Sequence, residues 1–130
     1  MSNLVRVVSA AIIDDGWILL VRKNGIYIPP GGKIKPGESQ EECLRREIRE
    51  ELSDTEVGPI RQYRPFIGRS ISGDSMIKAM IYFTSIHGKL GKPSAEIEGY
   101  AWVHRDTKDC WRVSEATRDM MNALYADGLF

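Results

Sequence analysis

The chain has 130 residues, which is enough for one domain with its own hydrophobic core and leaves no need for a structural metal or a disulfide framework. Hydrophobic residues make up 42% and charged residues 28%, a composition that excludes an intrinsically disordered chain. Eighteen basic residues balance eighteen acidic ones, so a strongly basic nucleic-acid-binding protein is not expected. We predict a single domain over residues 1–130.

The cysteines and the N-terminal segment bear on the cellular compartment. Cys43 and Cys110 lie far apart and form no Cys-x-x-Cys or Cys/His cluster, so no zinc site is expected. The apolar run over residues 7–13 is too short to cross a membrane and has no small-residue cleavage site behind it. We therefore expect a cytoplasmic protein with reduced thiols and no membrane partner.

The first predicted elements are strands. Val5–Ile13 and Trp17–Arg22 flank the turn residues 14–16, and this arrangement predicts a β-hairpin. Ile26–Ile28 predicts a short third strand, which ends at the Pro-Pro-Gly-Gly segment over 29–32.

A polar loop over 33–38 leads into a predicted helix. Ser39 is the expected N-cap, and Glu42, three residues later, completes a capping box. We expect this helix to run from about Gln40 to about Leu52, with an apolar stripe formed by Leu44, Ile48 and Leu52.

The second half of the chain predicts further strands and a late helix. The strands are expected over 62–67, 76–86 and 100–104, with a loop over 87–93. Ser114 predicts the N-cap of the last helix, whose apolar face would carry Val113, Ala116, Met120 and Leu124. These elements predict an α/β or α+β sandwich around a mixed sheet.

The early helix carries three carboxylates on one side. At about 100° per residue, Glu50 lies about 60° from Glu47 in one direction and Glu51 about 40° in the other, so all three share one wedge beside the apolar stripe. Like charges this close repel, and a divalent cation would remove the repulsion. Oxygen ligands of this kind suit Mg²⁺ or Mn²⁺. The alternative is a solvated acidic face paired with Arg45, Arg46 and Arg49.

The loop ahead of the helix favours a metal site. Gly31 and Gly32 allow the backbone to approach a ligand closely. Lys33 and Lys35 place positive charge beside the carboxylates. Cations next to metal ligands are expected where a polyanion such as a phosphate chain bridges to the metal.

This loop and helix resemble the signature of the Nudix hydrolases. The signature is a Gly, five residues, a Glu, seven residues and then Arg-Glu-apolar-x-Glu-Glu. The chain keeps every spacing, with Gly32, Glu38, Arg46, Glu47, Ile48, Glu50 and Glu51. The resemblance implies the family's α/β/α sandwich, an α/β fold in which a mixed central β-sheet lies between the signature helix, which follows the Gly-rich loop, and a C-terminal helix.

The chain departs from the signature at its end. A glycine and an apolar residue normally follow, where this chain has Ser53 and Asp54. That glycine takes the left-handed conformation that ends the helix, which would cost a serine about 1 kcal/mol. Aspartate tolerates this conformation better, so Asp54 is the expected helix stop.

The resemblance also implies roles for single residues. The metal ligands would be Glu47, Glu50, Glu51 and the Gly32 carbonyl oxygen. Glu38 would lie near the metal or pair with Arg46, which orients the glutamates. The catalytic residues that the resemblance implies within the signature are Glu47, Glu50 and Arg46. The reaction would be attack of water on a phosphorus of a nucleoside diphosphate linked to another group, with Mg²⁺ or Mn²⁺ as cofactor.

Further candidates lie outside the signature. Glu96 is the favoured general base, with an ordinary loop glutamate as the alternative. Lys33, Arg22 and Lys23 are candidate phosphate contacts. One aromatic residue is expected to stack on the base, and the candidates are Tyr82, Tyr27 and the three tryptophans.

The loop and the small size resemble the MutT-type branch, which hydrolyses nucleoside triphosphates to monophosphate and pyrophosphate. The expected substrate is such a triphosphate, whether ordinary, oxidised or otherwise non-standard. The proline of the ADP-ribose branch and the tyrosine of the dinucleoside-polyphosphate branch are missing around 69–72. ADP-ribose, a nucleotide sugar, a dinucleoside polyphosphate, or a non-hydrolytic nucleotide-binding module are the alternatives. We expect a small nucleotide as partner, no nucleic acid polymer, and a monomer or homodimer.

Overall fold

The first sheet is built around the β-branched N-terminal segment. In the computed structural model, which describes residues 4–94 and 96–130, this segment forms β1 (Leu4–Ala11) within a sheet of order β5-β1-β8-β7. β1 pairs in parallel with β8 (Met76–Phe83) and antiparallel with β5 (Gly31–Lys33). β7 (Arg61–Arg69) pairs antiparallel with β8 at the edge, so the sheet is mixed, as predicted.

A second sheet is centred on β3 (Trp17–Lys23). This strand pairs antiparallel with β10 (Gly99–His104) and with two short strands, β2 (Ile13–Asp14) and β4 (Ile26–Ile28). A separate two-stranded ribbon joins β6 (Thr55–Val57) to β9 (Ile86–Gly88).

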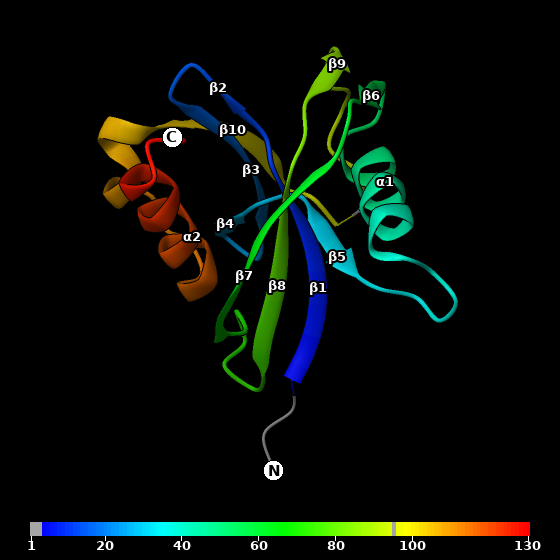
Figure 1. Ribbon diagram of the computed structural model, residues 1–130, viewed down its shortest axis with the longest axis horizontal. Helices are drawn as coiled ribbons and strands as arrows, with labels where there is room; N and C mark the ends of the chain where they lie inside the picture. Colours follow the sequence, from blue (N-terminus) through cyan, green and yellow to red (C-terminus); the bar gives the residue numbers. More distant parts are fainter. Residues whose placement is uncertain (1–3, 95) are drawn as a thin grey trace.

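Two helices cover the sheets from opposite sides (Figure 1). α1 (Gln40–Glu51) lies on one side and α2 (Glu115–Ala126) on the other, with the short 3₁₀ helix η1 (Arg105–Cys110) just before α2. Both predicted N-caps are confirmed, because the Ser39 and Ser114 side chains each accept a hydrogen bond from a backbone N–H in the first turn. Across the described ranges, no helix has the length and hydropathy needed to span a membrane.

The apolar alternation of β3 divides the core into two layers. Leu19 and Val21 face α1, where they pack with Leu44 and Ile48. Ile18 and Leu20 face the α2 side, where the core also contains Ile81, Met120 and Leu124. Because the strand is buried on both faces, its sequence is a continuous apolar run. The predicted α/β/α sandwich is therefore the observed fold.

The predicted hairpin is much shorter than expected. β1 is buried on both faces at its C-terminal half and pairs inside the first sheet, so it is not the partner of β3. Only Ile13–Asp14 pair with β3, around a turn in which Asp15 and Gly16 have φ values of 47° and 82°. The chain thus passes from one sheet to the other near Ile12.

Other boundaries also differ from the sequence-based expectation. Gly31 and Gly32, expected in a loop, begin β5, and the predicted strand over 76–86 stops at Phe83. The short elements β6, β9 and η1 were not predicted. The left-handed conformation predicted for Asp54 is confirmed with φ 68°, but α1 already ends at Glu51 with Leu52 as its C-cap, so Asp54 lies two residues beyond the helix stop.

Candidate active site

Two glycines bring β5 close to its neighbours. A Cβ on Gly31 would lie 2.1 Å from the Val8 carbonyl oxygen, so only glycine allows this approach to β1. A Cβ on Gly32 would lie 2.4 Å from the Glu47 carboxyl carbon. Gly32 therefore leaves the space in which the Glu47 carboxylate of α1 lies against the backbone of β5.

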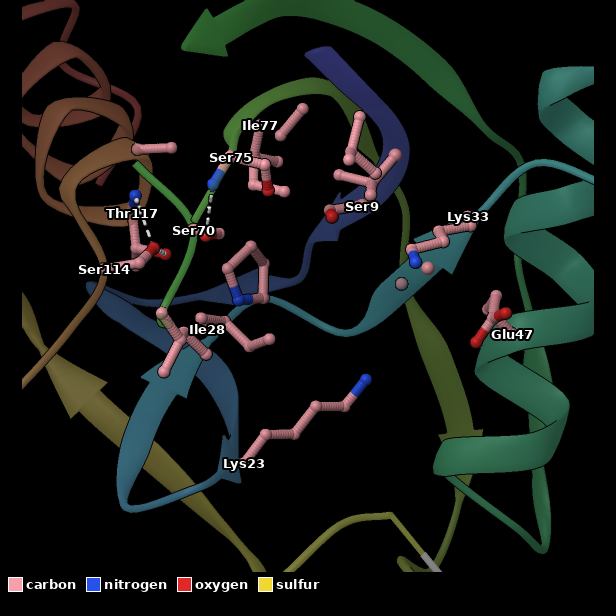
Figure 2. A pocket seen from close by; sticks show the side chains of 18 of the residues that line it. Ser9, Lys23, Ile28, Lys33, Glu47, Ser70, Ser75, Ile77, Ser114 and Thr117 are labelled. Carbon is pink, nitrogen blue, oxygen red and sulfur yellow. Dashed lines mark hydrogen bonds between the residues drawn. The ribbon is translucent and has the colours of Figure 1, made fainter. Parts of the chain in front are cut away.

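The three glutamates of α1 differ in their surroundings. Glu51 is only 4% exposed, and its Oε1 accepts a hydrogen bond from the Gly31 N–H at 2.7 Å. Glu47 is partly buried and points from α1 into the open space beside β5 (Figure 2). The Glu50 side chain is 57% exposed and reaches Arg46 at 3.5 Å. The three carboxylates of the shared wedge thus range from buried, at Glu51, to solvent-exposed, at Glu50.

Arg46 binds the loop and the helix together. Its Nε and Nη2 donate to the two carboxylate oxygens of Glu38 at 2.6 and 3.0 Å, and its Nη1 donates to Glu47 at 2.8 Å. The Arg46 hydrogen bonds, followed by that from the Lys35 N–H, lower the pKa of Glu38 to about 2. Of the two roles implied for Glu38, pairing with Arg46 is the one that the structure displays.

Lys23 at the end of β3 balances the buried carboxylate. Its Nζ lies 2.6 Å from Glu51 Oε2, although this oxygen receives no hydrogen bond of good geometry within the described residues. Burial raises the pKa of Glu51, and the charge of Lys23 opposes that rise. The carboxylate is thus held by one ion pair and one backbone N–H.

Of these groups, Lys23, Gly31, Gly32 and Glu47 line a cleft of about 760 Å³, a size in the range of small-molecule sites. The charged residues that line it are Lys23, Lys33, Lys35, Glu47, Arg69 and Glu96. The remainder is largely apolar and carries hydroxyl groups, and its lining includes Val7, Ile77, Met120, Ser70, Ser75, Ser114 and Thr117. Figure 2 shows Lys23 and Glu47 approaching the same open space from different elements.

Two predicted substrate contacts lie outside the cleft. Arg22 forms an ion pair with Glu98 at 3.4 Å, because neighbouring residues of a strand point to opposite faces and Lys23 takes the cleft side. Tyr82 packs on the α1 side of the first sheet, and its hydroxyl donates to Gln40. The geometry therefore favours Lys23 over Arg22 and gives no support to stacking by Tyr82.

Sequence reasoning missed the hydroxyl groups of the cleft. Ser9, 6% exposed, lies on its β1 wall, and Ser70, Ser75 and Thr117 come from the β7–β8 turn and α2. Ser9 had a detectable signal, since it is the one polar residue in the apolar run over 7–13. The others carry no local signal, because distant segments bring them together.

Cys43 lies beneath the signature. Its Sγ is 3.5 Å from the Lys33 carbonyl oxygen, and burial raises the pKa of the thiol to about 11. The thiol is therefore a packing group rather than a nucleophile.

The donor set fits a divalent cation in its chemistry. All candidate ligands are oxygens, Gly32 leaves room beside Glu47, and the buried Glu51 Oε2 lacks a hydrogen bond of good geometry. Over 4–94 and 96–130, however, no three acidic, His or Cys side chains converge on one point. The side chains stay apart because Lys23 holds Glu51, Arg46 holds Glu47, and Glu50 extends into solvent.

Comparisons with known proteins agree with this geometry. The family model described as the NUDIX domain matches residues 3–123. The CTP pyrophosphohydrolase of Escherichia coli (strain K12) is 35% identical over 131 residues, covering 95% of this chain and 93% of its own. The nucleoside triphosphatase NudI of Escherichia coli O81 (strain ED1a) is 31% identical over 130 residues, covering 86% of this chain and 90% of its own.

Solved structures show the same fold. The solution structure of the E. coli ORF135 protein has a TM-score of 0.74 at 28% identity and covers 96% of this chain and 91% of its own. A MutT NUDIX hydrolase from Burkholderia pseudomallei has a TM-score of 0.74 at 23% identity and covers 93% of this chain and 98% of its own. The chain belongs to the Nudix family of hydrolases.

Proposed function

We propose that the protein hydrolyses a nucleoside triphosphate to the monophosphate and pyrophosphate with the help of Mg²⁺ or Mn²⁺. The observation that carries this proposal is a single cleft that joins one signature carboxylate, that of Glu47, to Lys23, Lys33 and Lys35 and to a largely apolar surface. The two relatives above, which cover 95% and 86% of this chain, are named for action on CTP and on nucleoside triphosphates. Their names support a triphosphate over the other diphosphate derivatives.

The residues of the cleft suggest a division of labour. Lys23 and Lys33 bind the phosphates, and the apolar part of the cleft holds the base and sugar. Glu47, Glu50, Glu51 and the Gly32 carbonyl oxygen would hold the cation, which when bound polarises phosphoryl oxygens and lowers the pKa of water. Arg46 fixes the orientation of Glu47 through the 2.8 Å contact.

Proton transfer is assigned to Glu96, which lines the cleft, whereas Glu98 is held by the Gly25 N–H and Arg22. The oxygen of water attacks a phosphorus, Glu96 takes the proton, and the bond to the leaving pyrophosphate breaks.

Substitution of the carboxylates tests the catalytic assignment. We expect Glu50→Gln and Glu51→Gln each to lower turnover of a triphosphate with Mg²⁺ by about 100-fold, because each loses a charged oxygen ligand. Glu41→Gln is the matched control, since this glutamate is on α1 but is exposed and paired with Arg45. Near-normal turnover in both variants would remove the assignment.

A substrate panel tests the triphosphate. Nucleoside triphosphates, including oxidised ones, are compared with ADP-ribose, a nucleotide sugar and a dinucleoside polyphosphate, and a triphosphate is expected to have the highest kcat/KM. Faster cleavage of one of the others reassigns the substrate. Tight nucleotide binding without any turnover would instead indicate a binding module.

A further inference from the structure

The backbone of Lys23 is held firmly at the base of the cleft. It pairs with Ile26 across a two-residue turn in which Asn24 and Gly25 have φ values of 51° and 75°, as hairpin turns of this length require. The Gly25 N–H also donates to Glu98 at 2.9 Å. A fixed backbone with a flexible four-carbon side chain lets the Lys23 ammonium move while its anchor stays in place.

The ammonium has one polar contact in the described part of the chain, the 2.6 Å ion pair with Glu51. A buried carboxylate needs a positive partner, because its desolvation is otherwise uncompensated. In the same part of the chain, Lys23 is the one basic side chain in ion-pair contact with Glu51. Lys23 thus supplies the charge that a bound cation would supply.

Arg46 makes the contrast clear. It donates to both oxygens of Glu38, to Glu47 and to the Lys33 carbonyl, so its position is set by several partners. Loss of one contact would leave Arg46 in place. The Lys23 side chain already extends along the cleft (Figure 2), so loss of Glu51 would leave its ammonium free to contact another anion there.

We propose that Lys23 is an exchangeable counter-ion: it holds Glu51 until a divalent cation takes over this carboxylate, and the freed ammonium then binds a substrate phosphate. The proposal rests on the proposed function to the extent that Glu51 is a cation ligand. The ammonium and the cation compete for one oxygen, so Lys23 weakens cation binding in the absence of substrate. The exchange also couples cation binding to substrate binding, because a cation bound at Glu51 releases the Lys23 ammonium for a substrate phosphate.

Mn²⁺ binding without nucleotide tests the exchange directly. We expect Lys23→Met to bind Mn²⁺ about fivefold or more tightly than the unmodified chain, measured from the electron paramagnetic resonance signal of free Mn²⁺. Lys23→Arg, which keeps the charge, and Lys89→Met, in an exposed loop, are expected to stay within about twofold. In steady-state assays, Lys23→Met should raise KM for a triphosphate more than it lowers kcat.

Unchanged or weaker Mn²⁺ binding by Lys23→Met would overturn the proposal. If this variant does not fold, Lys23→Gln replaces it, and Mg²⁺ should raise its Tm more than it raises that of the unmodified chain. If neither folds alone, refolding rescued by Mg²⁺ supports the exchange, and no rescue refutes it. Tighter Mn²⁺ binding without any nucleotide hydrolysis would refute only the proposed function, whereas hydrolysis without tighter binding would refute only the exchange.

Discussion

The helices α1 and α2 have the same length and the same kind of cap, but they bury different chemistry. Each has 12 residues and an N-cap serine whose side chain accepts a first-turn N–H. α2 buries Met120, Met121 and Leu124, and its buried Thr117 is paired with Ser114. α1 buries Glu51 in its last turn, next to the exposed Glu50.

The difference indicates that α2 serves mainly the stability of the fold and that α1 serves mainly the reaction. Carboxylates at the negative end of a helix are unfavourable by about 0.3–1 kcal/mol each, and burial of Glu51 adds to this cost. Lys23 and Arg46 offset part of it. α2 also has a carboxylate at its C-terminal end, Asp127, but this residue is exposed, so α2 buries no charge in its last turn and contributes mainly apolar packing to the core.

The largest effect on stability is expected from α2. Leu124→Ala should lower the free energy of unfolding by about 2–5 kcal/mol, because the side chain is fully buried and leaves a cavity. Urea denaturation measures the loss. Leu124 is not among the residues that line the cleft, so well below the unfolding transition kcat and KM should match those of the unmodified chain. A large drop in kcat there would show that the packing of Leu124 also shapes the cleft.

On α1 we expect a substitution to lower activity with little effect on stability. Glu47→Gln should reduce kcat/KM by about 100-fold, because the carboxylate faces the cleft, while the free energy of unfolding changes by no more than about 1 kcal/mol. Asp119→Asn makes the same chemical change at an exposed position of α2 and should leave both quantities unaltered. Similar activity losses in the two variants would remove the distinction between the helices.

The caps should be nearly equivalent. Ser39→Ala and Ser114→Ala each remove one hydrogen bond to a helix N–H, at 3.1 and 3.2 Å, and each should cost about 1 kcal/mol in chemical denaturation. A much larger loss for Ser39→Ala would mean that the capping box also supports the signature loop.

The smallest expected effect is on the pH dependence of stability, and it comes from the ion pair between Glu38 in the loop and Arg46 on α1. Arg46 lowers the pKa of Glu38 from 4.5 to about 2, so the ionised carboxylate stabilises the fold above pH 4.5. That contribution disappears as the pH falls from 4.5 toward 2. Glu38→Gln should therefore show a shallower loss of stability than the unmodified chain over this range in urea titrations, and identical slopes would contradict the prediction.

Features encoded by neighbouring residues were predictable from the sequence. The N-caps, the capping box of α1 and the apolar stripes depend on spacings of three or four residues, and the Nudix signature lies within one loop and helix. The left-handed conformation of Asp54 could be predicted because it is a local property of the residue type.

Pairings between distant segments could not be predicted. The parallel partner of β1 is β8, which follows more than half of the chain later, and no local pattern specifies that register. Likewise, the choice between Arg22 and Lys23 as the cleft residue depends on which face of β3 is turned to α1. The ion pair with Glu51 exists only once both sheets are assembled.

The different settings of the two cysteines have a practical consequence. The Cys43 thiol is buried with a pKa of about 11, whereas Cys110 is exposed at the end of η1. Because the thiolate is the reactive form, a maleimide at neutral pH should modify Cys110 alone. The natural sequence thus offers a single attachment point for a fluorophore or spin label, and ligand binding could be followed without introducing any new cysteine.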